Sequence, residues 1–182
     1  MTNQLSIAKI WWRNVQLGEF YNIERFYKIS GGGGSLYIEI PSSIVPATLD
    51  FLGVASTQVN SVPTITIEAH VIGLPSISGP IEFHPKSGGR MRIARQNRQQ
   101  PNSQRHPAWI STRGFPRAPD SIQSTDDARP YFPEGGLRIY IAKTKEGYYY
   151  AGVTKGPRPA NMIRSDPMWD LYGNGVGGVI DG

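Results

Sequence analysis

The 182-residue chain contains no cysteine. This absence excludes disulfide bonds, thiolate nucleophiles and cysteine-based metal sites, and it agrees with a reducing compartment. The chain also lacks any run near the ~20 apolar residues that a membrane-spanning helix needs. Its first ten residues do not have the apolar core of a secretion signal. We therefore expect a soluble, cytoplasmic protein that does not enter a membrane.

Long helices are also unexpected, because 15 prolines and 21 glycines interrupt most windows of the sequence. One short helix is predicted at 43–52, where Ser42 or Ser43 can cap the first turn and Pro46 falls within it. Alternation of apolar and polar residues predicts strands at 20–29, 36–40, 64–71, 81–83, 137–142 and 148–153. The last two should form a hairpin through 144–147. The sequence therefore predicts a mainly β domain with one or two short helices.

Negative charge is missing from a long central segment, because residues 83–119 contain neither Asp nor Glu. Basic residues recur along this segment, namely Lys86, Arg90, Arg92, Arg95, Arg98, Arg105, Arg113 and Arg117. Amide side chains lie between them, at Gln96, Asn97, Gln99, Gln100, Asn102 and Gln104, together with His106. Arginine matches phosphates and guanine, and the amides match adenine. The net charge of +5 is concentrated here, so we expect a nucleic acid as partner.

A solvated, unstructured loop is the simpler interpretation of such a basic run. Two features count against it. Residues 90–93 alternate basic and apolar side chains, which is typical of a half-buried strand with its charged face outward. Trp109 and Ile110 can anchor the far end of the segment.

No catalytic or metal site is expected from the sequence. The three histidines, His70, His84 and His106, do not have the spacing of metal ligands. The glycines of 31–34 are not followed by the Lys and Ser or Thr of a phosphate-binding loop. They predict either a flexible connection or an arm that contacts DNA.

Several segments together resemble a known family. They are the predicted strand 20–29, which ends in Tyr27-Lys28-Ile29-Ser30, the glycine-rich loop, the run Ile40-Pro41-Ser42-Ser43-Ile44-Val45, the strand with Glu68-Ala69-His70-Val71, and the arginine-rich segment before Trp109. In order and spacing, residues 20–155 resemble the N-terminal DNA-binding domain of EcoRII-like restriction endonucleases. That domain has the pseudobarrel shared with plant B-three transcription factors.

The resemblance implies a B-three-like, seven-stranded pseudobarrel that grips the major groove between two arms. In this chain the arms would be 28–37 and 90–113. The resemblance and the basic segment together suggest these DNA-binding residues: Arg25, Lys28, Ser30, Gly34, Ser35, Tyr37, Arg90, Arg92, Arg95, Gln96, Asn97, Arg98, Gln104, Arg105, His106 and Arg113. The first arm is shorter and richer in glycine than in the family, so either Tyr37 or Glu39 can take the base-proximal place.

The expected function is sequence-specific binding of double-stranded DNA, with a CCWGG-like target, by a monomer. Residues 1–160 would form the DNA-binding domain, and 161–182 would be a tail or linker towards a missing catalytic domain. The whole protein would then be a prokaryotic type II restriction endonuclease, in which this domain recognises the target or serves as an effector site. No cofactor is expected for this chain, and magnesium only for the separate nuclease domain.

Two other functions stay open at the level of sequence. A single-stranded nucleic-acid binding β-barrel would stack bases on aromatic residues, the candidates being Trp11, Trp12, Tyr148, Tyr149 and Tyr150. A small metal-dependent nuclease would need carboxylates from distant segments, such as Glu68, Asp120 and Asp126. A carbohydrate-binding module would not explain the acid-free basic segment.

Overall fold

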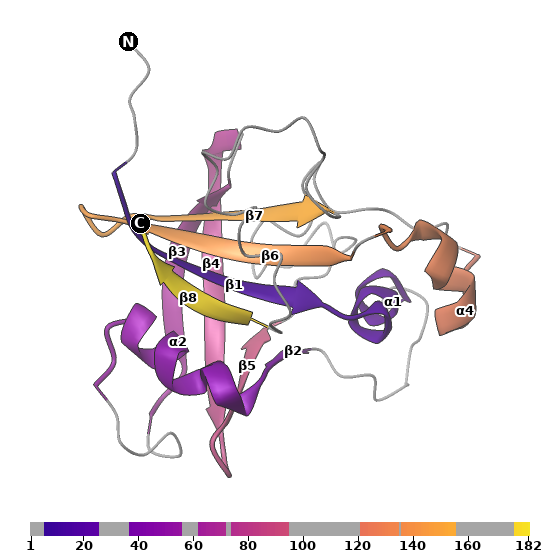
Figure 1. Cartoon of the computed structure of the whole chain (residues 1–182), viewed down its shortest axis with the longest axis horizontal. Helices are drawn as coiled ribbons and strands as arrows, with labels where there is room; N and C mark the ends of the chain where they lie inside the picture. Colours follow the sequence, from indigo (N-terminus) through magenta and orange to yellow (C-terminus); the bar gives the residue numbers. More distant parts are fainter. Residues whose placement is uncertain are drawn as a thin grey trace.

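The computed structural model describes residues 6–25, 37–55, 62–71, 74–94, 121–134, 136–155 and 177–182. In this part of the chain, eight strands form one curled sheet that encloses the core like half of a barrel (Figure 1). The strand order is β2-β5-β4-β3-β7-β6-β1-β8. A few short helices lie at the ends of the curled sheet. The prediction of a mainly β protein is confirmed.

The first half of the sheet is continuous in sequence. It consists of the antiparallel strands β2 (Tyr37–Ile40), β5 (Arg90–Ala94), β4 (Leu74–Lys86) and β3 (Ile65–Val71). Alternation predicted these strands because one side of each faces the core: Ile38, Ile81 and Met91 are fully buried. A turn through two glycines, Gly88 and Gly89, joins β4 to β5 with φ angles of 72° and 70°.

The second half combines the two ends of the chain. It consists of β7 (Tyr149–Lys155), β6 (Leu137–Thr144), β1 (Ile7–Val15) and β8 (Gly177–Asp181). The predicted hairpin between β6 and β7 is confirmed, and its turn contains Gly147 at φ 90°. A short parallel ladder between β3 and β7 joins the two halves, and every other strand pair is antiparallel.

The core lies between the two halves, where Trp11 of β1 meets Phe83 of β4 edge to face, with ring centroids 5.9 Å apart. The predicted short helix is present as a 3-10 turn, η2 (Ser42–Ile44), followed by α2 (Val45–Phe51). Thr48 of α2 accepts a hydrogen bond of 2.9 Å from the indole Nε1 of Trp11. This helix therefore closes one end of the half-barrel and satisfies a buried donor there.

The prediction of a strand at 20–29 is wrong for its described part, because Leu17–Arg25 forms helix α1. Phe20 and Tyr21 are adjacent, and both are buried, which a strand packed on one face does not allow. Leu17, Phe20 and Tyr21 have the i, i+3, i+4 spacing of a helix face. Glu19 also accepts the backbone N–H of Gln16 at 2.9 Å, which satisfies a donor at the helix N-terminus.

The expected tail at 161–182 contributes a strand to the sheet. Its described part, Gly177–Asp181, is β8, which pairs antiparallel with β1 at the sheet edge. A Cβ on Gly178 would lie 3.3 Å from Nε1 of Trp12, so the indole rests against a residue without a side chain. The N-terminal segment, which the sequence left ambiguous, provides β1 between β6 and β8.

A second, smaller apolar cluster covers the outer face of β1 and β6. Ile10, Trp12 and Ala142 are its buried members, and the guanidinium carbon of Arg138 lies 4.3 Å from the Trp12 ring centroid. A Cβ on Gly152 would lie 2.5 Å from the Tyr140 hydroxyl oxygen, so this ring packs directly on the β7 backbone. The two tryptophans of β1 thus point to opposite faces, and both pack against protein.

Candidate nucleic-acid interface

The two predicted arms connect to the sheet at one point. Segment 26–36, which holds most of the first arm, enters β2 at Tyr37. Segment 95–120, which holds most of the second, leaves β5 at Ala94. Tyr37 and Ala94 are register partners in the antiparallel β2–β5 ladder. Opposite residues in such a ladder are about 5 Å apart, so the chain enters β2 from segment 26–36 beside the point where it leaves β5 for segment 95–120.

The elements that adjoin the other ends of the same two segments are in contact. Segment 26–36 begins where α1 ends, and segment 95–120 is followed by α4 (Thr125–Ala128) and the 3-10 turn η4 (Arg129–Tyr131). Helices α1 and α4 are in contact on one side of the molecule (Figure 1). The Tyr21 hydroxyl donates a 2.6 Å hydrogen bond to the carbonyl of Gln123, and the ring centroids of Phe20 and Phe132 are 5.5 Å apart.

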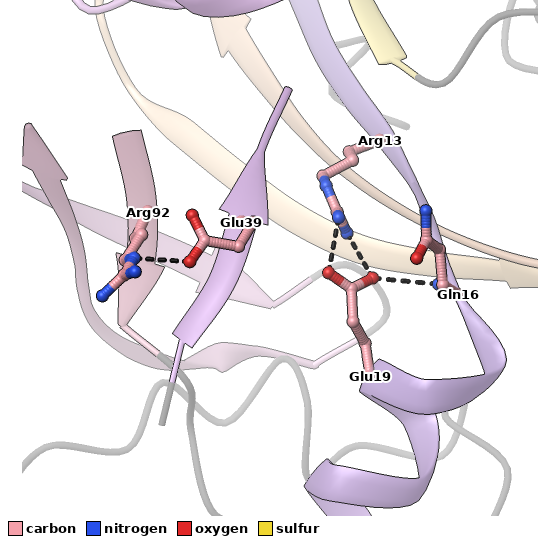
Figure 2. A network of polar contacts seen from close by, with 5 residues as sticks. All are labelled: Arg13, Gln16, Glu19, Glu39 and Arg92. Atoms are coloured by element: carbon pink, nitrogen blue, oxygen red, sulfur yellow. Dashed lines mark hydrogen bonds and ion pairs between the residues drawn. The ribbon is translucent and has the colours of Figure 1, made fainter. Parts of the chain in front are cut away.

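A buried ion pair fastens α1 to the sheet. Arg13 of β1 donates through both terminal nitrogens to Glu19 of α1, at 2.7 Å and 2.5 Å (Figure 2). The Arg13 side chain is 4% exposed and that of Glu19 17% exposed. A two-pronged contact of this kind fixes orientation as well as distance. Helix α1, which leads into segment 26–36, is therefore tied to β1, the strand that lies between β6 and β8.

Helix α4 is held by a capping box. The Ser124 hydroxyl accepts the N–H of Asp127, and the Asp127 carboxylate accepts the N–H groups of Gln123 and Ser124, both at 2.9 Å. These hydrogen bonds, that of Gln123 first, lower the pKa of Asp127 below its ordinary value. The end of the second segment is thus locally ordered by its own sequence.

Of the predicted arm residues, Arg90 and Arg92 have described side chains. Arg90 is exposed, but it lies at the β4–β5 turn, where its Nε donates to the carbonyl of Ser87. Ala94 is four positions further along the strand, a distance of roughly 13 Å. Arg90 is therefore distant from the point where the second segment leaves the sheet.

Arg92 lies on the outer face of β5, directly opposite Glu39 of β2. Its Nε is 2.5 Å from a Glu39 carboxylate oxygen, and both side chains are partly exposed (Figure 2). His84 of β4 follows in the same cross-strand row and contacts Glu82 at 3.1 Å and Thr64 at 3.3 Å. The outer face of β2, β5 and β4, next to Tyr37 and Ala94, is therefore polar and has charges of both signs.

Most of the predicted DNA-binding residues lie outside the described residues: Lys28, Ser30, Gly34, Ser35, Arg95, Gln96, Asn97, Arg98, Gln104, Arg105, His106 and Arg113. The structure describes Arg25 and Tyr37 by their backbone, as the last residue of α1 and the first of β2. The prediction that these side chains contact DNA stays a prediction. What the structure adds is the position of the segment ends.

The aromatic residues considered for base stacking are mostly packed inside the protein. Trp11 and Trp12 are buried. Tyr149 packs edge to face on Phe51 with centroids 5.9 Å apart, and Tyr150 lies 5.3 Å from the His70 ring. Tyr148, which is 60% exposed, lies at the β6–β7 turn.

Sequence reasoning missed the ion pair between Arg13 and Glu19. The signal that could have found them is the i, i+3, i+4 pattern from Leu17, because it places Glu19 in the first turn of a helix directly after β1. The pairing itself depends on how the helix folds back on the strand.

Among the residues that the structure describes, no group of three His, Asp or Glu side chains is arranged to hold a metal ion. No helix in the described ranges is long and apolar enough to cross a membrane. No protein-family model matches the chain, and no curated protein matches it significantly.

Proposed function

We propose that this chain is a sequence-specific, double-stranded DNA-binding module, and that it is the target-recognition or effector domain of an EcoRII-like restriction endonuclease. The observation that carries the proposal is the pairing of Tyr37 with Ala94, because the two arm segments join the sheet at these neighbouring residues. The elements beyond their other ends, α1 and α4, are in contact. Two segments that begin and end on neighbouring elements suit a clasp around a duplex.

The chemistry of the second segment favours DNA over other partners. Five of its arginines, Arg95, Arg98, Arg105, Arg113 and Arg117, lie in a stretch whose first acidic residue is Asp120. Arginine can bind the O6 and N7 atoms of guanine with both ends of its fork, and Asn or Gln can do the same with adenine. Each such contact would contribute ~1–3 kcal/mol of discrimination between bases.

The attachment of both segments at both ends also favours specific binding. A loop with fixed ends has fewer conformations to lose on binding than a free tail, so more of the contact energy appears as affinity. The sheet supplies a rigid base, because β2 and β5 bury Ile38, Ile40, Met91 and Ile93 in the core. In this proposal the sheet corresponds to the B-three-like pseudobarrel, although the resemblance implies seven strands and the described sheet has eight.

Selection from a pool of random duplexes tests the proposal directly, because it requires no prior target. We expect one short motif to be enriched and then bound as a monomer. If about six phosphates are neutralised, the logarithm of affinity should fall with the logarithm of salt with a slope near −5. Recovery of no motif, together with a salt-independent signal, would contradict the proposal.

Alanine variants then assign roles within the second arm. If Arg95→Ala or Arg105→Ala removes a base contact, the selected duplex should lose affinity and a scrambled duplex should not. If the residue binds a phosphate, both duplexes should lose affinity equally and the salt slope should become shallower by about 0.9.

A single-stranded partner is disfavoured by the packing of the aromatic residues. A stacking platform needs exposed rings, whereas Trp11 and Trp12 are buried. Competition between the selected duplex and its separated strands tests this alternative, and we expect the duplex to win. A nuclease is tested by incubating the chain with plasmid and magnesium, for which we expect no cleavage.

A further inference from the structure

The buried pair Arg13–Glu19 occupies the junction between the sheet and the helix that leads into the first arm. Glu19 accepts three hydrogen bonds, two from Arg13 and one from the N–H of Gln16 (Figure 2). The same helix holds Gln123 through Tyr21, just before α4. The orientation of α1 therefore bears on an end of each arm segment.

Apolar contacts alone do not fix this orientation. Phe20 of α1 is fully buried, but the hydrophobic effect is not directional and tolerates rotation of a short helix on the surface beneath it. The bidentate contact is directional, since both oxygens of Glu19 must face both terminal nitrogens of Arg13. It is also expensive to bury, because Nε of Arg13 is buried without a hydrogen-bond partner among the described residues.

Helix geometry gives the size of the effect. Glu19 is six residues from Arg25, so about 9 Å of helix separates the ion pair from the end of α1, where segment 26–36 begins. A tilt of about 10° around Glu19 would move that end by roughly 1.5 Å. Contacts that read base edges must be held within about 0.5 Å, whereas mobile phosphate contacts tolerate more.

We propose that Arg13 and Glu19 are positioning residues for DNA target discrimination: their buried ion pair sets the orientation of α1 and thereby the placement of both arms. This inference rests on the proposed DNA-binding function and adds to it residues that do not touch DNA. Their loss should weaken reading of the target sequence more than general binding to DNA.

The test compares the selected and a scrambled duplex for Glu19→Gln, which keeps the side-chain size and removes the charge. The ratio of the two affinities should fall at least about fivefold, the lower limit for losing one bidentate base contact. Affinity for the scrambled duplex and its salt slope should stay within about twofold of the wild type. Binding is measured at a temperature where circular dichroism shows the variant to be folded.

Thr48→Val is the matched control. It removes the buried hydrogen bond to Trp11 at the α2 end of the half-barrel, where no arm segment begins or ends. A purely structural effect lowers the fraction of active protein and so reduces binding of both duplexes equally. Thr48→Val should therefore leave the affinity ratio unchanged.

If Glu19→Gln does not fold, the double variant Arg13→Met/Glu19→Leu provides the second test, because apolar replacement of a buried pair usually preserves stability. A folded double variant should show the same loss of discrimination. A wild-type ratio in either folded variant would overturn the inference and leave the proposed function intact. A wild-type chain that does not distinguish the two duplexes would instead contradict the proposed function.

Discussion

The outer faces of the two halves of the sheet differ, although both halves enclose the same core. On the face of β1 and β6, Trp12 and Ala142 are buried. On the face of β2, β5 and β4, Glu39, Arg92 and His84 are polar and partly exposed. Segments 26–36 and 95–120 join this half of the sheet at Tyr37 and Ala94. The comparison shows that the outer face of one half is covered by the protein's own side chains, whereas the outer face of the other half is polar and partly exposed to solvent.

The two faces also obtain their stability in different ways. The apolar face buries large rings against backbone, with Trp12 on Gly178 and Tyr140 on Gly152. The polar face holds ion pairs in which both partners contact solvent, and such pairs contribute roughly 0–1 kcal/mol each. Substitutions on the two faces should therefore differ in their cost to folding.

The largest difference is expected between Trp12→Ala and Arg92→Ala. Trp12→Ala removes a buried ring and leaves Arg138 without its stacking partner, so it should lower the free energy of unfolding by about 3–5 kcal/mol. Arg92→Ala removes an exposed ion pair and should cost less than about 1 kcal/mol. Urea denaturation monitored by circular dichroism measures both. Equal costs would break the distinction between the faces.

A smaller effect is expected for Gly152→Ala on the apolar face. The added Cβ would come within 2.5–2.9 Å of the Tyr140 ring, so that ring must move, at a cost of about 1–3 kcal/mol. Gly18→Ala is the matched control, because nothing lies within 4 Å of its Cβ position in α1. Alanine should stabilise this helix by up to about 1 kcal/mol. Thermal melts would test the opposite signs, and a neutral Gly152→Ala would show that the ring is loosely held.

The sequence was sufficient for those elements whose burial is one-sided. Ile65–Val71 and Arg90–Ala94 alternate because one side meets the core and the other meets solvent. Strand β1 is buried on both sides around Trp11 and Trp12, so it shows no clear period. β8 could not be found, because its glycines are explained by close contact with β1 and not by strand propensity.

The candidate site was predictable in its composition and not in its arrangement. The acid-free segment and its arginines are visible in the sequence. The pairing of Tyr37 with Ala94 depends on the register between strands that are more than fifty residues apart. The Arg13–Glu19 contact in turn requires helix α1, where alternation had wrongly suggested a strand. Long-range register and helix placement are tertiary properties that local patterns do not carry.

The smallest expected effect is a pH dependence of the stability of α4, the helix that follows segment 95–120. It sharpens the comparison because acid should loosen this helix before it loosens the buried strands. The hydrogen bonds from Gln123 and Ser124 lower the pKa of Asp127, so its carboxylate stabilises α4 fully above the ordinary value of 3.8. This contribution is lost as the pH falls below 3.8 and through the lower folded pKa. Hydrogen exchange of the α4 amides should therefore accelerate in acid, while the buried strand β6 serves as the internal reference. Asp127→Asn should show fast exchange in α4 already at neutral pH and a weaker response to acid.

Asp50→Asn is the control at the opposite end of the molecule. The pKa of Asp50 is lowered by its hydrogen bond with Lys9, so loss of that carboxylate should affect α2 instead of α4. Acid loosening that starts in β6 before α4 would contradict this assignment.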